Sequence, residues 1–396
     1  MVCILDLSIL IAFSISTLWA LPNPGEPTVR PSVVPPRAPQ NNLTSPPASS
    51  PKLAPPPPKP ASSSSTCKSV RVRKEWRTLS YEQQADYIKS IKCLVRLPSK
   101  LLGPSYRRWD DFEYVHCDLR KRLHTRPLFL PWHRYFTFVH EKILREECGF
   151  RGTVPYWNWT LDHKNITHSP VWSSDPVVGF GSNGSFFGPG SDPDDLDAGV
   201  VTDGAFARFP IYYPGRMMLQ RNFHLDPPFA IPGYYLGSQW YNPNNMEIIA
   251  SQANFSTFTM KLEGNYKQLD GTILPGPHSI IHSLLGGDMP DLAYSVNDVS
   301  GLCMYSHPVF LSPANQQSRI FSLLMSRMFF PHHARIDQVW WSWQTKDPGH
   351  RTYEYLPAGG FQANLDDELD YLGLVPKIKV REVMDTLKPP LCYRYE

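Results

Sequence analysis

The chain has 396 residues, and 41% of them are hydrophobic, so it can bury a sizeable core. Its 39 basic and 36 acidic residues give a formal net charge of +3 and are spread without long runs, which argues against a nucleic-acid surface and against stable membrane association. A small molecule is therefore the expected partner.

The first 66 residues are expected to lie outside the folded domain. Residues 1–20 form an apolar run that ends in alanine and predict a secretory signal peptide, with an uncleaved membrane anchor as the alternative. Residues 21–66 are rich in Pro, Ser and Ala and have little apolar surface to offset the entropy of ordering. We expect a disordered linker there and a folded domain over residues 67–396.

Sequons and cysteines both favour export to an oxidising compartment. The Asn-X-Ser/Thr sequons begin at Asn42, Asn158, Asn165, Asn183 and Asn254. Removal of the signal would leave an even number of cysteines, which suits disulfides. Sequence alone does not fix their pairing; our hypothesis is Cys67 with Cys392 and Cys93 with Cys148, with Cys117 reduced.

Apolar residues at helical spacing predict several amphipathic helices. The first follows a capping signature at Ser80 and spans residues 80–97. The others are expected over residues 109–122, 132–148, 276–286 and 332–346, whereas residues 160–245 are rich in Gly, Pro, Asn and Asp and predict long loops. The predicted fold is mainly α, with a four-helix bundle core that can project metal ligands inward and long irregular loops around it.

The histidines are unevenly placed along the chain. Two sets of three stand out, namely His116, His124 and His133, and then His278, His282 and His333. Neutral imidazole suits copper, zinc, iron and nickel, so three histidines per ion make chemical sense without selecting the metal. For any single histidine, a hydrogen-bonded core or surface residue is the competing interpretation.

Spacing supports the second set. His278 and His282 are four residues apart, so on a helix both rings stand on one face and can share an ion. His333 opens another predicted helix, with Asp337 one turn later on the same face, where a carboxylate can support a metal-bound histidine.

Longer motifs around these histidines resemble a known family. DDFEYVH (110–116) and HTRPLFLPWHRYFTFVHEKILREECGFRGTVPYWNW (124–159) resemble the first copper site of fungal tyrosinases and catechol oxidases. GPHSIIHSLLGGDM (276–289) and FFPHHARIDQVWWSWQ (329–344) resemble their second site. The resemblance covers roughly residues 67–396 and implies that the first set of histidines holds one copper ion and the second set another, with His332 lining the site.

This resemblance implies a secreted enzyme with two copper ions that uses O₂ to oxidise o-diphenols or o-aminophenols to o-quinones or quinone imines. The substrate ring is expected beside His282. Phe329, Phe330, Trp132 and Trp340 are candidate pocket walls, or ordinary core aromatics. Many relatives have a C-terminal lid domain; this chain ends at Glu396, and no activation by its removal is expected.

The sequence departs from the family in two places. Ser279 stands where hydroxylating tyrosinases commonly have Asn, which works there with a nearby Glu. Ser279 and Glu263 are thus candidate catalytic residues, but little hydroxylation of monophenols is expected. Residues 299–327 interrupt the motif that precedes His333, either as a real loop or as a retained intron.

Two other functions stay open at this point. A haemocyanin-like oxygen-binding protein can use the same six histidines, but it blocks phenol access with a neighbouring domain. A catalytically impaired protein could keep the scaffold and lose the second copper through the 299–327 insertion. Copper analysis and oxygen uptake with catechol separate these possibilities.

Overall fold

The computed structural model describes residues 66–184, 199–213, 216–225, 229–268, 271–286 and 327–396. Helices dominate this part of the chain, as predicted. They are α1 (Tyr81–Leu94), α2 (Asp110–Leu123), α3 (Phe129–Cys148), α4 (Pro243–Ala250), α5 (Phe255–Glu263), α6 (Pro277–Leu285), α7 (Phe329–Thr345) and α8 (Pro348–Arg351). The proposed signal peptide, the linker and nearly all of the 299–327 insertion lie outside the described residues.

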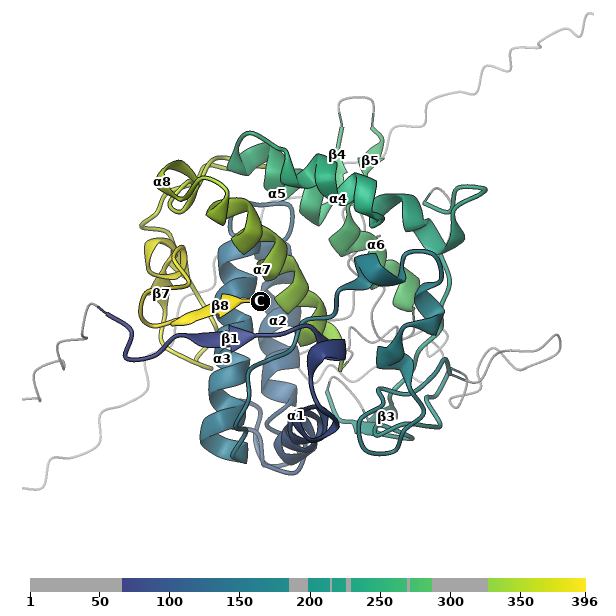
Figure 1. The fold of residues 1–396 in the computed structure, drawn as a ribbon. Helices are drawn as coiled ribbons and strands as arrows, with labels where there is room; N and C mark the ends of the chain where they lie inside the picture. The colour runs from purple at the N-terminus through teal and green to yellow at the C-terminus, as the bar shows by residue number, and fades with distance from the viewer. Residues whose placement is uncertain (1–65, 185–198, 214–215, 226–228, 269–270, 287–326) are drawn as a thin grey trace, which may run out of the picture. The chain divides into compact units, whose positions relative to one another are not determined.

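The strands are short and occur in pairs. β1 (Arg71–Arg73) pairs in parallel with β8 (Tyr393–Tyr395), so the start and the end of the described chain lie side by side (Figure 1). Three antiparallel pairs complete the set: β2 (Pro210–Ile211) with β3 (Met217–Met218), β4 (Tyr266–Lys267) with β5 (Ile273–Leu274), and β6 (Glu368–Leu369) with β7 (Ile378–Lys379).

Helix boundaries follow the local sequence. The Ser80 side chain accepts a hydrogen bond from the Gln83 backbone N–H, and the Gln83 side-chain oxygen accepts one from the Ser80 backbone N–H, which confirms the predicted capping box of α1. α3 and α7 begin three residues earlier than predicted, and each has a proline, Pro131 or Pro331, in its first turn. Proline is tolerated there because the first backbone N–H groups of a helix have no acceptor within the helix.

The core is built where α2, α3 and α7 meet (Figure 1). The rings of Phe112 in α2 and Phe136 in α3 lie 5.6 Å apart, and Trp109 at the start of α2 meets Phe330 of α7 edge-on at 5.8 Å. These rings are almost fully buried, and aromatic burial of this kind is a large part of the free energy of folding. α3 therefore packs against both α2 and α7, and this packing determines which of its side chains point into the core.

A buried ion network ties α7 to the strand pair. The Asp337 carboxylate accepts hydrogen bonds from Arg134 Nε at 2.5 Å and from the Tyr393 and Tyr395 hydroxyls, the latter at 2.6 Å. Arg73 of β1 lies 3.5 Å from the same carboxylate. Asp337 thus binds arginines and tyrosines and has no direct hydrogen bond to a histidine of the described residues, but it does hold Arg134, the residue after His133.

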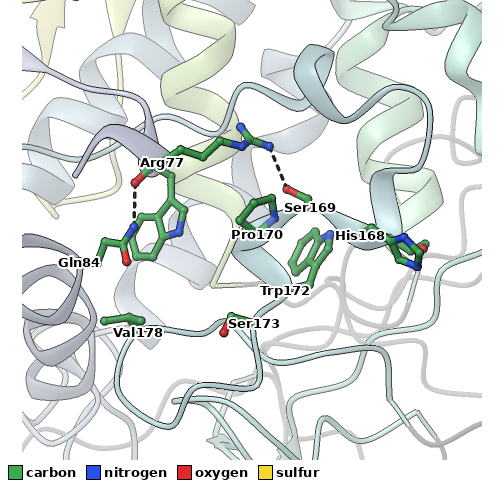
Figure 2. Close-up of a pocket in the computed structure, with 10 residues that line it drawn as sticks. Arg77, Gln84, His168, Ser169, Pro170, Trp172, Ser173 and Val178 are labelled. Carbon is green, nitrogen blue, oxygen red and sulfur yellow. Dashed lines mark hydrogen bonds between the residues drawn. The ribbon is translucent and has the colours of Figure 1, made fainter. Parts of the chain in front are cut away.

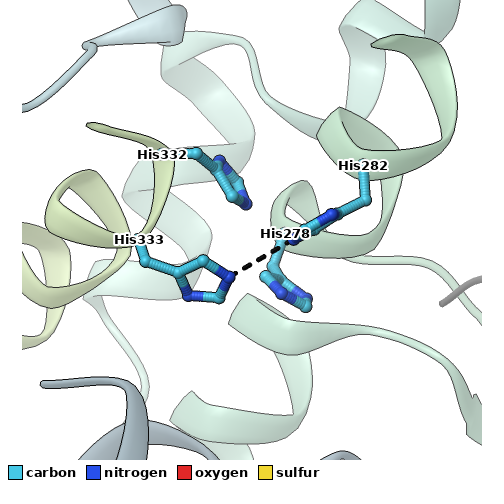
Figure 3. Close-up of side chains that lie close together, drawn as sticks. All are labelled: His278, His282, His332 and His333. Carbon is cyan, nitrogen blue, oxygen red and sulfur yellow. Dashed lines mark hydrogen bonds between the residues drawn. The ribbon is translucent and has the colours of Figure 1, made fainter. Parts of the chain in front are cut away.

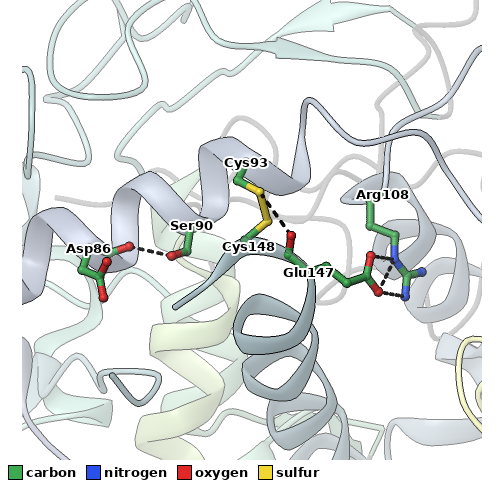
Figure 4. The surroundings of a disulfide bond; sticks show 6 residues. All are labelled: Asp86, Ser90, Cys93, Arg108, Glu147 and Cys148. Carbon is green, nitrogen blue, oxygen red and sulfur yellow. Dashed lines mark hydrogen bonds and ion pairs between the residues drawn. A yellow bond between two sulfur atoms is a disulfide. The ribbon is translucent and has the colours of Figure 1, made fainter. Parts of the chain in front are cut away.

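Disulfides hold both the ends of the domain and one helix pair. Cys67 is bonded to Cys392, and Cys93 of α1 is bonded to Cys148 at the end of α3 (Figure 4). Both pairings agree with the hypothesis from the sequence. Cys117 is also disulfide-bonded, so the expectation of a reduced thiol at this position is wrong.

Three short helices were not predicted. α4 and α5 begin after Asn242 and Asn254, whose side chains accept a hydrogen bond from the backbone N–H of the third residue of each helix. In sequence these asparagines are typical of loops as well as of caps, and α8 is only four residues long. None of the helices in the described residues is long and apolar enough to span a membrane.

Candidate metal centre

The first histidine set comes from two neighbouring helices. His116 lies in α2, His124 directly follows the last residue of α2, and His133 lies in the first turns of α3. Each offers a ring nitrogen, and these atoms all lie within 4.8 Å of one another. The structure therefore brings together three histidines that span eighteen residues of sequence.

Backbone contacts orient two of these rings. His124 Nδ1 lies 3.1 Å from the Arg120 carbonyl oxygen, and His133 Nδ1 lies 2.8 Å from that of Phe129. With Nδ1–H donating to a carbonyl, Nε2 is left as the acceptor. The Nε2 atoms of His116, His124 and His133 are buried and have no hydrogen-bond partner among the described residues.

The second set comes from α6 and α7, and a fourth histidine, His332, lies beside it. His278 and His282 stand one turn apart on α6, while His332 and His333 open α7, and all four rings converge (Figure 3). His282 Nε2 lies 3.3 Å from His333 Nε2. Two nitrogens bound to one ion at about 2 Å with a tetrahedral angle would be separated by about that distance, so this pair fits a shared metal ion.

The two sets lie against each other. His133 of the first and His333 of the second stack with ring centroids 4.2 Å apart and planes within 8°. His124 and His278 are also near-parallel at 5.7 Å. Phe329 packs between the sets, 4.8 Å from His116 and 4.2 Å from His333. The arrangement suits two ions in adjacent positions.

Burial keeps these histidines neutral. It lowers the pKa of His124 to about 4 and the pKa values of His116, His133, His278, His332 and His333 well below the ordinary value, with neighbouring rings adding to the effect for these five. A metal ligand must be the neutral imidazole, so the environment already favours the ligating form at neutral pH.

The aromatic residues singled out in the sequence divide into two groups. Phe329 and Trp132 contact the first set, the latter with its ring 4.9 Å from that of His133. Phe330 packs against His140 at 3.6 Å, and Trp340 lies under the Arg134 guanidinium at 3.5 Å. The latter two are core residues, as the competing interpretation held.

Ser279 lies next to His278 in α6, and Glu263 contacts Thr125, the residue after His124; both side chains are already hydrogen-bonded. The Ser279 hydroxyl donates to the Gly276 carbonyl oxygen at 3.0 Å in the first turn of α6. One oxygen of Glu263 accepts from the Thr125 backbone N–H at 2.7 Å and the other from the Tyr266 hydroxyl at 2.8 Å. Burial raises the pKa of the Glu263 carboxyl well above its ordinary value.

A separate cavity of about 840 Å³ lies on the surface beside η1 (Trp76–Thr78) and η4 (Pro170–Trp172) (Figure 2). Its lining includes Trp76, Arg77 and Trp172, and Arg77 donates to the Ser169 hydroxyl at 3.4 Å. None of the seven clustered histidines lines it. The cavity is therefore distinct from the histidine centre.

Sequence reasoning missed part of the centre. It expected His332 as a neighbour lining the site, and the structure brings a ring nitrogen of His332 within 4.8 Å of those of His278, His282 and His333. It also passed over Tyr266 and Thr125. Tyr266 follows Glu263 by only three residues, but the hydrogen bond of Glu263 to Thr125 joins residues 138 positions apart and has no sequence signature.

Comparison with known proteins agrees with this geometry. A family model described as the common central domain of tyrosinase matches residues 106–299. The chain is 32% identical over 345 residues to tyrosinase-like protein phomQ1 of Diaporthe leptostromiformis, covering 83% of this chain and 78% of the relative. Tyrosinase ustQ of Aspergillus flavus is 32% identical over 339 residues, with 83% and 80% covered.

Two further likenesses extend the comparison. N-acetyl-6-hydroxytryptophan oxidase ivoB of Emericella nidulans is 30% identical over 373 residues, with 83% of this chain and 93% of the relative covered. A mutant form of polyphenol oxidase from Thermothelomyces thermophila has the same fold, with a TM-score of 0.62 at 24% identity over 83% of this chain and 89% of that chain. The tyrosinase family has a dinuclear copper site, and the two histidine sets of this chain fit such a site. The chain therefore belongs to the tyrosinase family.

Proposed function

We propose that this chain is a copper-dependent oxidase that converts o-diphenols or o-aminophenols to o-quinones or quinone imines, with O₂ as the oxidant. The observation that carries the proposal is the pair of adjacent histidine sets, whose ring nitrogens converge on two neighbouring points. His116, His124 and His133 would hold one copper ion, and His278, His282 and His333 the other. When bound, the two ions would supply the site at which O₂ takes up electrons from the substrate.

The chain's own residues have defined tasks in this proposal. Carbonyl contacts at His124 and His133 point Nε2 toward the ion, and burial keeps the imidazoles neutral. Phe329 packs on both histidine sets and limits the space available to water and to the ring of a substrate. The substrate ring would bind beside His282.

The overall reaction is balanced without any other reactant. Two molecules of o-diphenol lose two electrons and two protons each, and one O₂ is reduced to two molecules of water. Relatives support a hydroxylated aromatic substrate: one is named as a tyrosinase and one as an oxidase of a hydroxyindole amino acid. The ring hydroxyl is the feature that such substrates share.

Hydroxylation of monophenols is expected to be slight. Ser279 has no amide to orient a water molecule, and its hydroxyl is used within the first turn of α6. Both oxygens of Glu263 are used as well. Both side chains are thus held by contacts within the protein, and Ser279 lacks the amide that would orient a water together with Glu263.

We also propose that the protein is secreted. The apolar residues 1–20, the sequons and the disulfides Cys67–Cys392 and Cys93–Cys148 are all typical of an exported protein. Expression in a secreting host should yield a protein in the medium whose N-terminus, determined by mass spectrometry, lies after residue 20. A protein retained in the cells with an intact N-terminus would contradict secretion.

Oxygen uptake with three substrates tests the function. The copper-loaded protein should consume O₂ with catechol and with o-aminophenol, and little or none with tyrosine. Two coppers with reversible O₂ binding and no oxidation of any of these would favour an oxygen-binding protein. Faster turnover of tyrosine than of catechol would contradict the role assigned to Ser279.

A further inference from the structure

The residue after His124 has an unusual backbone conformation. Thr125 has a φ of 55°, in the left-handed region, which is rarely adopted by a β-branched residue. α2 ends at Leu123, so His124 is not held by helical hydrogen bonds beyond its own N–H to the Arg120 carbonyl. The position of His124 thus depends on the turn that follows it, as well as on the contact of its ring Nδ1 with the Arg120 carbonyl oxygen.

Glu263 stabilises this turn from a distant part of the sequence. The side chain is 1% exposed, and its Oε1 accepts the Thr125 backbone N–H at 2.7 Å. Its Oε2 accepts the Tyr266 hydroxyl at 2.8 Å, and Tyr266 is 4% exposed. A buried carboxyl group that is hydrogen-bonded at both oxygens is held rigidly, so it can fix the amide that it binds.

The opposite side of Thr125 is closed by a tight turn at residues 358–361. A Cβ added at Gly359 would lie 2.2 Å from the Thr125 carbonyl oxygen and 2.9 Å from Tyr266 Cε1, so only glycine permits this approach. The Arg126 guanidinium lies over the Phe361 ring at 3.7 Å. Thr125 is therefore held from two sides, by a hydrogen bond to its N–H and by packing against its C=O.

From these contacts we propose that Glu263 is a positioning residue for His124, which acts through the Thr125 backbone N–H and is itself held by Tyr266. The proposal rests on the proposed function in one respect, since it takes His124 to be a copper ligand. It replaces the view of Glu263 as an acid–base group for the substrate. Copper binding at the first histidine set should therefore depend on the contact between Glu263 and Thr125 more than copper binding at the second set does.

Three variants separate positioning from acid–base chemistry. Glu263→Ala removes the acceptor and should weaken copper binding at the first set by roughly 10- to 100-fold, the range seen when outer partners of metal ligands are lost. Glu263→Gln keeps an oxygen for the Thr125 N–H and should bind two coppers and oxidise catechol like the wild type. In Glu263→Ala/Thr125→Gly, glycine adopts positive φ without strain, so copper binding should recover in part.

Metal content and EPR give the readout. At a buffered free copper concentration that just fills both wild-type sites, Glu263→Ala should hold about half the copper of the wild type, as a lone paramagnetic Cu(II) in the second set, whereas Glu263→Gln should match the wild type. Full copper occupancy in Glu263→Ala would overturn the proposal. So would a Glu263→Gln variant that binds two coppers but no longer oxidises catechol, because that result requires a carboxylate rather than an acceptor.

A measurement on the copper-free protein tests the contact between Glu263 and Thr125 by itself. In the metal-free protein, hydrogen exchange of the Thr125 amide should be slow in the wild type and in Glu263→Gln and faster in Glu263→Ala. Unchanged hydrogen exchange of the Thr125 amide in Glu263→Ala would overturn the proposal that Glu263 holds this amide. A wild-type protein that binds no copper but shows the expected exchange pattern would contradict the proposed function while leaving the contact between Glu263 and Thr125 established.

Discussion

His133 and His333 lie in separate helices, yet their imidazole rings stack face to face with centroids 4.2 Å apart. One ring belongs to each histidine set, so a ligand of one proposed copper ion is in direct contact with a ligand of the other. Any change that displaces α7 relative to α3 should therefore disturb both ions.

The first prediction concerns the two adjacent histidines of α7. His333 faces His282 nitrogen to nitrogen at 3.3 Å, whereas His332 stacks on His278 at 5.4 Å. His333→Ala should lose the copper of the second set, and His332→Ala should keep two coppers while oxidising catechol more slowly. Copper analysis of both variants checks this, and equal copper loss in the two would show that His332 is a ligand of equal rank.

The second prediction concerns Asp337. Its removal leaves Arg134 buried without a carboxylate and deprives Arg73 of one of its two partners. Asp337→Ala should lower the free energy of unfolding by about 3–5 kcal/mol, as expected when one partner of a buried ion pair is lost. The measurement is urea unfolding of the metal-free protein.

Asp366 provides a matched control for this substitution. It pairs with Lys379 and Arg381, but the side chain is 49% exposed. Asp366→Ala should change the free energy of unfolding by less than about 1 kcal/mol. Similar losses in the two variants would show that the Asp337 network contributes no more than a surface pair.

The third prediction concerns pH. Burial lowers the pKa of His124 to about 4, below the value of about 6.5 expected in the unfolded chain. Between these values the unfolded chain binds more protons than the folded one, so the free energy of unfolding falls as pH drops from about 6.5 to about 4, by about 3 kcal/mol for His124 alone. The other buried histidines of the centre act in the same direction.

Unfolding of the chelator-treated protein at several pH values measures this slope. His124→Gln should have a shallower dependence than the wild type, because one of the titrating groups is gone. A free energy of unfolding that is flat or rises between pH 6.5 and 4.5 would show that the histidines of the metal-free site are more hydrated than the structure indicates.

The fourth prediction concerns the disulfide between α1 and α3. Cys93 and Cys148 close a loop with a sequence separation of 55 residues, and Arg108 binds Glu147 beside them (Figure 4). Cys93→Ser/Cys148→Ser should lower the free energy of unfolding by about 3 kcal/mol through the greater entropy of the unfolded chain. Copper content should stay at two per chain, since no clustered histidine contacts this disulfide; loss of copper would show that α1 holds α3 in place for the centre.

The sequence predicted much of the centre because its signals are local. The four-residue spacing of His278 and His282 and the motifs around His116, His124 and His133 lie within single segments. Helix type and approximate position followed from periodicity and from the cap at Ser80. A four-helix arrangement was then predicted because the apolar faces of the helices must be buried and because the two histidine sets must lie close together.

The rest depended on contacts between remote segments. Asp337 finds its partners in β8, 56 and 58 residues away, and Glu263 finds Thr125 at a separation of 138 residues. Nothing in the spacing of these residues marks the pairs. The expected reduced state of Cys117 failed for the same reason, because proximity to a metal ligand in sequence says nothing about a thiol's partner in space.

Copper content tests the central claim most directly. The protein, reconstituted with excess copper and freed of unbound metal, should contain two copper ions per chain, and His116→Ala/His133→Ala should contain one. One copper or none in the wild type would contradict a dinuclear centre built from these two histidine sets.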